Sequence, residues 1–133
     1  MRNVDVTRLK EEAVEACKDL IIRANQDQLR EGQNAKGQLI RPAYSVPYMK
    51  KKRRMSSYHA PIGTPDLFLN GDFQGAMDVI VENGQYDIVS WDEKNVFLQL
   101  MYDDIFGLTE ESRNTVRPFV TKKLGELIKM KLN

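Results

Sequence analysis

Residues 77–90 read MDVIVENGQYDIVS, and this stretch decides the fold. Met77, Val79 and Val81 share one face of the run before Asn83-Gly84, and a second β-prone run follows that dipeptide. Asn-Gly between two such runs is the strongest short-range signal for a hairpin, because both turn residues need a positive φ. We therefore predict a β-hairpin over residues 76–91, within a small antiparallel sheet.

The chain before the hairpin begins with a helical pattern. Over residues 7–31, apolar side chains recur at three- and four-residue spacings, which predicts one long amphipathic helix. Asp5 or Thr7 can cap its start, and Gly32 can end it. The apolar stripe consists of Val6, Leu9, Ala13, Cys17, Leu20, Ile21 and Ala24. Because Cys17 lies in this stripe, we expect a buried small hydrophobe and not a reactive thiol.

Three helical segments follow the hairpin. One is a helical turn that starts at Thr109, with Glu110 and Glu111 at its positive end. A short helix is predicted over residues 93–103, where Asp92 can cap it, and a closing helix over residues 117–132, with Pro118 in its first turn. In the short helix the expected inward side chains are Phe97, Leu98 and Met101, with Tyr102 at the edge. In the closing helix the expected buried stripe is Phe119, Val120, Leu124, Leu127, Ile128 and Leu132. The predicted fold class is therefore α+β, with two flanking helices packed on the small sheet.

Residues 32–66 interrupt this regular pattern with four prolines and three glycines. We predict one domain over residues 1–133, from which residues 35–64 extend as a long basic loop arm. The composition of the arm cannot make a core of its own, but it can lie along a partner. The arm carries the run Lys50-Lys51-Lys52-Arg53-Arg54.

Charges are sorted along the chain, although the net charge is only +1. Residues 1–60 carry thirteen Lys/Arg against seven Asp/Glu, residues 61–112 carry one against eleven, and residues 113–133 carry six against one. In one interpretation, the two basic ends of the chain pack against the acidic middle of the same chain. The sorting equally suits identical subunits that pack positive face on negative face. Chance clustering on solvated faces is the third interpretation.

Residue types that carry catalysis or bind metals are scarce. Cys17 and His59 are the single Cys and the single His, so we expect neither an intrachain disulfide nor a structural zinc site. No hydrolytic triad and no phosphate-binding glycine loop is visible, and the adjacent acids Asp92-Glu93 and Asp103-Asp104 diverge. We expect no catalytic residue, no metal site and no cofactor, and therefore no enzymatic activity.

The bulk composition also excludes some classes. An apolar share of 41% with 29% charged residues is typical of a globular chain and not of a disordered one. No apolar run approaches the ~20 residues that a membrane span needs. The start of the chain lacks the apolar core of a signal peptide, so we expect residence in a cytoplasm and no membrane partner.

The basic run at 50–54 has three interpretations. Lys50, Lys51, Lys52, Arg53 and Arg54 can contact nucleic-acid phosphates. Tyr48, with Tyr44 and Tyr58, flanks the run and can stack on bases. The same cations can instead meet the acidic middle of a neighbouring subunit, or lie in a solvated loop.

Three short motifs resemble those of the tail-completion, or head–tail joining, proteins of long-tailed bacteriophages. Asn70-Gly71-Asp72-Phe73 followed by Ala76-Met77 is similar to the motif that opens the first core strand of that family, with Asn70 where the family has Thr. Phe106-Gly107 matches a Phe-Gly turn, and Arg117-Pro118-Phe119-Val120 resembles the start of its closing helix. The resemblance covers roughly residues 7–31 and 65–130.

Membership of that family implies a virion structural protein, assembled in the host cytoplasm. It implies a ring of identical subunits, commonly six, between the head connector (portal side) and the tail tube, around the DNA channel. The basic arm would then contact a protein partner or the channel DNA. Two alternatives are a small nucleic-acid-binding accessory protein that uses residues 48–58, and a minor capsid or packaging-associated protein.

Overall fold

A computed structural model describes residues 5–55, 57–68 and 71–132. The α+β class expected from the sequence is confirmed, with a two-stranded antiparallel sheet and a long C-terminal helix. In chain order the elements are α1 (Val6–Ala16), α2 (Lys18–Arg30), α3 (Val46–Lys52), α4 (Asp72–Gly75), β1 (Met77–Glu82), β2 (Gln85–Ser90), α5 (Asn95–Met101) and α6 (Glu110–Leu132).

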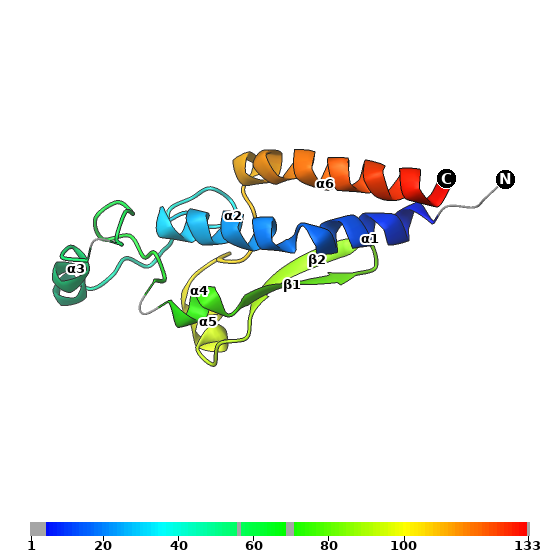
Figure 1. Ribbon diagram of the computed structural model, residues 1–133. Coiled ribbons are helices and arrows are strands. Elements are labelled where there is room, and N and C mark those ends of the chain that lie inside the picture. The colour runs from blue at the N-terminus through cyan, green and yellow to red at the C-terminus, as the bar shows by residue number, and fades with distance from the viewer. Residues whose placement is uncertain (1–4, 56, 69–70, 133) are drawn as a thin grey trace.

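The elements form an elongated body (Figure 1). Helices α1 and α2 run end to end through its middle, α6 lies antiparallel along one side of them, and the hairpin lies along the other side. Helix α3 and the chain around it form a lobe beyond the end of α2 (Figure 1). The main core joins α2, the hairpin, α5 and the start of α6, through residues that include Ile21, Leu29, Val79, Leu98 and Val116.

The predicted hairpin is confirmed. Strands β1 and β2 pair from Met77↔Ser90 to Glu82↔Gln85, and the paired residues Val79 and Ile88 are both buried. Asn83 and Gly84 have φ values of 53° and 75°, so both turn residues occupy the left-handed region. This is the geometry that the Asn-Gly dipeptide favours, because it matches the right-handed twist of the strands.

A valine in place of Gly84 tests the turn. We expect Gly84→Val to lower the free energy of unfolding by about 1–2 kcal/mol, because a β-branched residue is strained at positive φ. A Cβ atom there would also lie 3.3 Å from Thr7 Cγ2 on α1. Thermal unfolding followed by circular dichroism measures the change. Gly125→Val in α6, where a Cβ meets no atom within 4 Å, is the matched control and should melt close to wild type. Equal melts for the two variants would contradict the turn geometry.

The single N-terminal helix predicted over residues 7–31 is wrong in one respect, because the structure has two helices with a break at Cys17. The φ and ψ of Cys17 are −106° and 11°, outside the helical region, and its N–H donates to the carbonyls of both Ala13 and Val14. The expected ends are otherwise confirmed. Asp5 caps α1 by accepting the Arg8 N–H at 3.2 Å, and Gly32 follows α2 with a φ of 79°. Cys17 is buried, as its place in the apolar stripe predicted.

The closing helix begins at Glu110, seven residues earlier than predicted, so Pro118 lies inside α6 and not in its first turn. Pro118 is exposed, so the helical carbonyl that loses its donor there can be hydrated. The predicted buried stripe is also wrong in part. Val116 is the fully buried residue of α6, whereas Phe119 and Leu132 are exposed and Val120, Leu124, Leu127 and Ile128 are half-buried.

Candidate functional site

The basic run does not lie in a loop as predicted, because its first three residues belong to α3. Ser45 caps this helix by accepting the Tyr48 N–H at 3.4 Å, and Pro47 occupies the first turn, where a proline is tolerated. The cap and the proline start a helix locally, even within a segment rich in prolines and glycines. Arg53 and Arg54 follow directly after its end.

Lys52 points into the protein and not toward a partner. Its Nζ lies 2.8 Å from Asp66 Oδ1 and donates to the Phe68 carbonyl at 2.6 Å, and the residue is 0% exposed. The rings of Tyr44 and Tyr58 lie 5.9 and 5.5 Å from the ammonium. The expectation that Lys52 contacts DNA or a partner is therefore wrong, because its charge is already neutralised inside the arm.

Asp66 is the centre of the network that holds the arm. Besides Lys52, it accepts the Tyr44 hydroxyl at 3.1 Å and the Phe68 N–H at 3.1 Å on Oδ1. Its carbonyl accepts from Gln74 Nε2 at 2.9 Å, which links the arm to α4. Met49 and Ala60 are also buried, so the arm has a small interior, contrary to the expectation that it could not make one. Ile40, by contrast, packs into the main core.

The other four cations of the run remain exposed. Lys50, Arg53 and Arg54 line a small cleft of about 340 Å³, and Lys51 is exposed beside them. Guanidinium and ammonium groups around one hollow suit a phosphate or carboxylate. Tyr48 is not available beside this cleft to stack on nucleic-acid bases. It is half-buried, meets the Tyr44 ring edge-on at 4.8 Å, and faces a different cavity.

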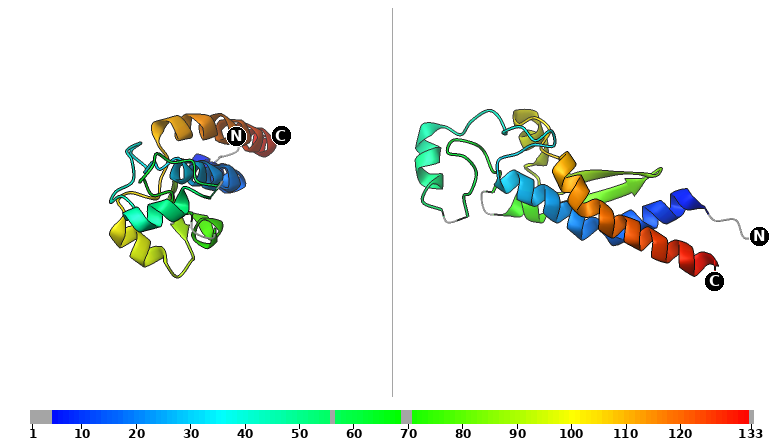
Figure 2. Two further views of the ribbon diagram at one scale, coloured as in Figure 1. Left: turned by 90° about the vertical axis from the view of Figure 1, so that its left-hand side faces the viewer. Right: turned by 90° about the horizontal axis from the view of Figure 1, so that it is seen from above.

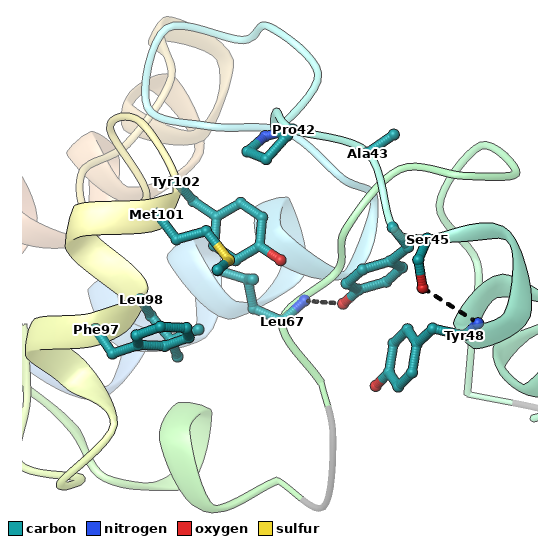
Figure 3. A pocket seen from close by; sticks show the side chains of 10 residues that line it. Pro42, Ala43, Ser45, Tyr48, Leu67, Phe97, Leu98, Met101 and Tyr102 are labelled. Carbon is teal, nitrogen blue, oxygen red and sulfur yellow. Dashed lines mark hydrogen bonds between the residues drawn. The ribbon is translucent and has the colours of Figure 1, made fainter.

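That cavity is an apolar pocket between α5 and the segment that leads into α3 (Figure 3). Its volume is about 470 Å³. Phe97, Met101 and Tyr102 line one side, and Ser45 and Tyr48 line the other (Figure 3). The remaining lining residues are Pro42, Ala43, Tyr44, Leu67 and Leu98.

The prediction that Phe97 and Met101 point into the core is wrong. Leu98 and Tyr102 are the buried residues at this helix, whereas Phe97 is 60% and Met101 43% exposed. Val96 and Leu100 are exposed next to them, and Leu100 reaches 83%. We call Val96, Phe97, Leu100 and Met101 the α5 patch. Contiguous apolar residues of this kind on a protein surface mark an interaction site.

The tyrosines around the pocket and elsewhere in the chain all have a pKa shifted in the same direction. The pKa values of all five are raised, first because burial disfavours the phenolate and, for Tyr44, Tyr48 and Tyr58, also because of the negative charge of Asp66. Unfolded tyrosines ionise near pH ~10, so the contribution of these raised pKa values to the stability of the fold is fully present below that pH. It falls as the pH rises further, because the unfolded chain loses its protons first.

We therefore expect tyrosinate absorbance in the native protein to lag behind that in urea at pH ~10, where unfolded tyrosines are about half ionised. We expect it to rise together with the loss of the circular dichroism signal as alkali unfolds the chain. The urea-denatured protein is the control. Superimposable titrations of the native and denatured chains would contradict the burial of these hydroxyls.

Two of the three motifs quoted for the phage resemblance meet in the structure, and the third lies apart from them. Phe73 stacks on Phe106, with ring centroids 5.7 Å apart, and Gly107 directly follows Phe106 along the chain. Gly71 precedes α4, and β1 begins only at Met77, after the first motif has formed a helical turn. Arg117, Pro118 and Phe119 are exposed on α6 and do not join this group. Asn70 lies outside the described residues.

Sequence reasoning missed two buried amides on α2 that hold the loop before α6. Asn25 donates to the Ile105 carbonyl at 3.1 Å and accepts the Gly107 N–H at 2.9 Å. Gln28 donates to the Gly107 carbonyl at 2.9 Å and accepts the Thr109 N–H at 2.8 Å. Their one sequence signal is position, because both lie on the face of the helix that carries Ile21 and Leu29.

The described residues also bear on two other kinds of site, a cluster of metal ligands and a membrane span. Among them, no group of three His, Cys, Asp or Glu side chains is placed to hold a metal ion. No helix formed by the described part of the chain has the length and apolar character needed to cross a membrane. Comparison of the chain with protein-family models, with curated proteins and with solved structures found no match.

Proposed function

We propose that this protein is a non-enzymatic structural subunit that assembles into a homo-oligomeric ring, in the manner of the tail-completion or neck proteins of phage virions. The observation that carries the proposal is a pair of separate apolar surfaces. One is the α5 patch with its pocket, and the other is the exposed apolar end of α6. When two different apolar surfaces of identical subunits bind each other, the contact is heterologous. Heterologous contacts close into a ring when the rotation between neighbouring subunits allows it.

The resemblance supplies the biological setting of this proposal. Its motifs occur in the expected order, and Phe73 and Phe106 from two of them meet in one core. In that setting the partners are copies of the chain, a connector on the portal side and the tail-tube protein, with DNA passing through the channel. The site of action is the virion.

The state of the purified protein tests the proposal. We expect particles whose mass is an integral multiple of 15.4 kDa by light scattering, and closed rings with a central hole by negative-stain electron microscopy. A monomer across the accessible concentration range would contradict ring assembly. Open filaments without closed rings would contradict the neck setting while leaving self-association intact.

Charge sorting predicts how salt acts on this assembly. The acidic residues 61–112 and the basic segments on either side suit contacts between subunits, each worth ~0–1 kcal/mol at an exposed rim. We expect the oligomer to weaken from low to high salt, because counter-ions screen these pairs. Sedimentation of the same sample across a salt series measures the shift. An oligomer fraction independent of salt would show that charge does not set the contact.

A second candidate function is contact with nucleic acid, and the cleft formed by Lys50, Arg53 and Arg54 favours it. Replacing these three with Ser should weaken the binding of a labelled DNA duplex. It should also reduce the slope of log affinity against log salt by about 0.9 for each phosphate that the variant no longer neutralises. Arg23 on α2 and Arg117 and Lys122 on α6, all exposed, provide a control triple change to Ser with the same change in net charge. Equal effects of the two triple variants would point to net charge and not to the cleft.

A further inference from the structure

We propose that the last turn of α6 in one copy docks into the pocket beside the α5 patch of the next copy, head to tail. The inference rests on the proposed function of self-assembly and names the two surfaces that carry it. Both are exposed in the isolated chain, and both consist of apolar side chains with charged neighbours.

The end of α6 carries more apolar surface than its neighbour can cover. Met130 is 70% and Leu132 59% exposed. Two helical residues two positions apart point ~200° away from each other, so one neighbouring helix cannot bury both. Seen from above, the end of α6 also diverges from the start of α1 (Figure 2). Among the described residues both side chains stay exposed, so a second surface can bury at least one of them.

The pocket is already shaped to receive such side chains. Its floor is fixed, because Leu67, Leu98 and Tyr102 are buried and the Tyr44 hydroxyl accepts the Leu67 N–H at 3.2 Å. Phe97 and Met101 stand at its mouth (Figure 3). An apolar hollow with a firm floor and aromatic walls suits an amphipathic helix that inserts one or two large side chains.

The charges beside the two surfaces are opposite. Exposed Glu93 and Asp103 lie at the two ends of α5, where Lys94 is paired with Asp92 at 3.8 Å. Exposed Lys129 directly precedes Met130 at the end of α6. The cations Lys50 and Arg53 line a separate cleft and not this pocket. Acidic ends around an apolar hollow attract a basic helix and repel an acidic one, which favours α6 of a second copy as the occupant.

The positions of the surfaces fix the kind of assembly. The end of α6 lies at one end of the elongated body, and α5 lies toward the other end, near α3 (Figure 1). Each copy therefore offers one donor helix and one acceptor pocket. Contacts between unlike surfaces on opposite ends build a chain of subunits that closes into a ring or continues as a filament.

Two complementary variants test the contact. The donor variant, Met130→Glu with Leu132→Glu, keeps its pocket, and the acceptor variant, Phe97→Asp, keeps its helix end. All three residues are more than half exposed, so folding should survive, and circular dichroism checks this. Leu100→Asp, at the most exposed residue of the patch, is a second acceptor change. Ile62→Glu is the matched control, because Ile62 is 70% exposed and does not line the pocket.

We expect each variant alone to associate at least tenfold more weakly than wild type, and Ile62→Glu to associate normally. An equimolar mixture of the donor and acceptor variants should form a dimer and stop there, because only one intact contact is possible. If the mixture stays monomeric, the contact is not heterologous and the inference fails. If the donor and acceptor variants both assemble as well as wild type, the proposed contact between α6 and the pocket is wrong, but ring assembly itself is not contradicted. If wild type is a monomer, both proposals fail.

Discussion

Replacement of Lys52 by methionine is expected to lower the free energy of unfolding by about 3–5 kcal/mol, as breaking a buried ion pair does. Methionine keeps most of the volume of the side chain but removes its charge. The Asp66 carboxylate, itself 0% exposed, then loses the ammonium at 2.8 Å. The Tyr44 hydroxyl and the Phe68 N–H still donate to Oδ1, but these neutral donors do not replace the ammonium. The other oxygen, Oδ2, has no hydrogen-bond partner among the described residues. Urea unfolding at neutral pH, followed by circular dichroism, measures the change.

Two controls separate the buried pair from the basic run in which Lys52 lies. Lys51→Met removes an exposed charge one residue away and should change stability by less than about 0.5 kcal/mol. Adding Asp66→Asn to Lys52→Met should recover part of the stability, because the remaining group is then neutral. If Lys52→Met unfolds at the same urea concentration as Lys51→Met, Lys52 is not buried against Asp66 and the arm has no ion pair in its interior.

Replacement of Asn25 by alanine is expected to lower the free energy of unfolding by about 2–4 kcal/mol. Asn25 is 0% exposed, and its amide satisfies the Ile105 carbonyl and the Gly107 N–H. Removing the amide leaves both backbone groups without this partner and opens a cavity under the loop that leads into α6. The decrease in stability should therefore be accompanied by faster hydrogen exchange in residues 105–109.

Asn114→Ala is the matched control, because Asn114 is exposed on α6 and its contact is with Arg117 on the same helix. It should change stability by no more than about 0.5 kcal/mol. Asn25→Asp keeps an acceptor for the Gly107 N–H but buries a charge, so it should be at least as destabilising as the alanine. If the Asn25→Ala and Asn114→Ala proteins unfold at the same temperature, the buried amide does not hold the loop.

Features that depend on a few neighbouring residues could be predicted from the sequence. Asn83-Gly84 makes its turn because both residues accept positive φ, and Asp5 caps α1 because its side chain reaches an N–H three residues on. Gly32 follows the end of α2 for a local reason too, because glycine accepts the φ of 79° there. The α+β class follows from these elements, because their apolar faces must pack on one another.

The candidate surfaces could be predicted only in part. The run at 50–54 was visible as charge, but four of its five cations are exposed and the fifth is buried against Asp66, fourteen residues away. The apolar residues of α5 and α6 were visible as helical stripes, yet their exposure was not. A stripe shows which face is apolar, but not whether a neighbour is wide enough to cover it.

By itself, the sequence determined the hairpin, the Asp5 cap of α1 and the sorting of charge, because each is set within a few residues along the chain. The expected Asp92 cap of the short helix is wrong, because α5 begins only at Asn95 and has no side-chain cap. Only the tertiary structure decided which lysine of the run is neutralised, why Asn25 and Gln28 are inside, and which ends of α5 and α6 stay exposed. Those outcomes depend on partners such as Gly107, 82 residues from Asn25 along the chain. Whether a polar side chain is buried depends on the free energy of meeting such a partner, and the fold brings the two together.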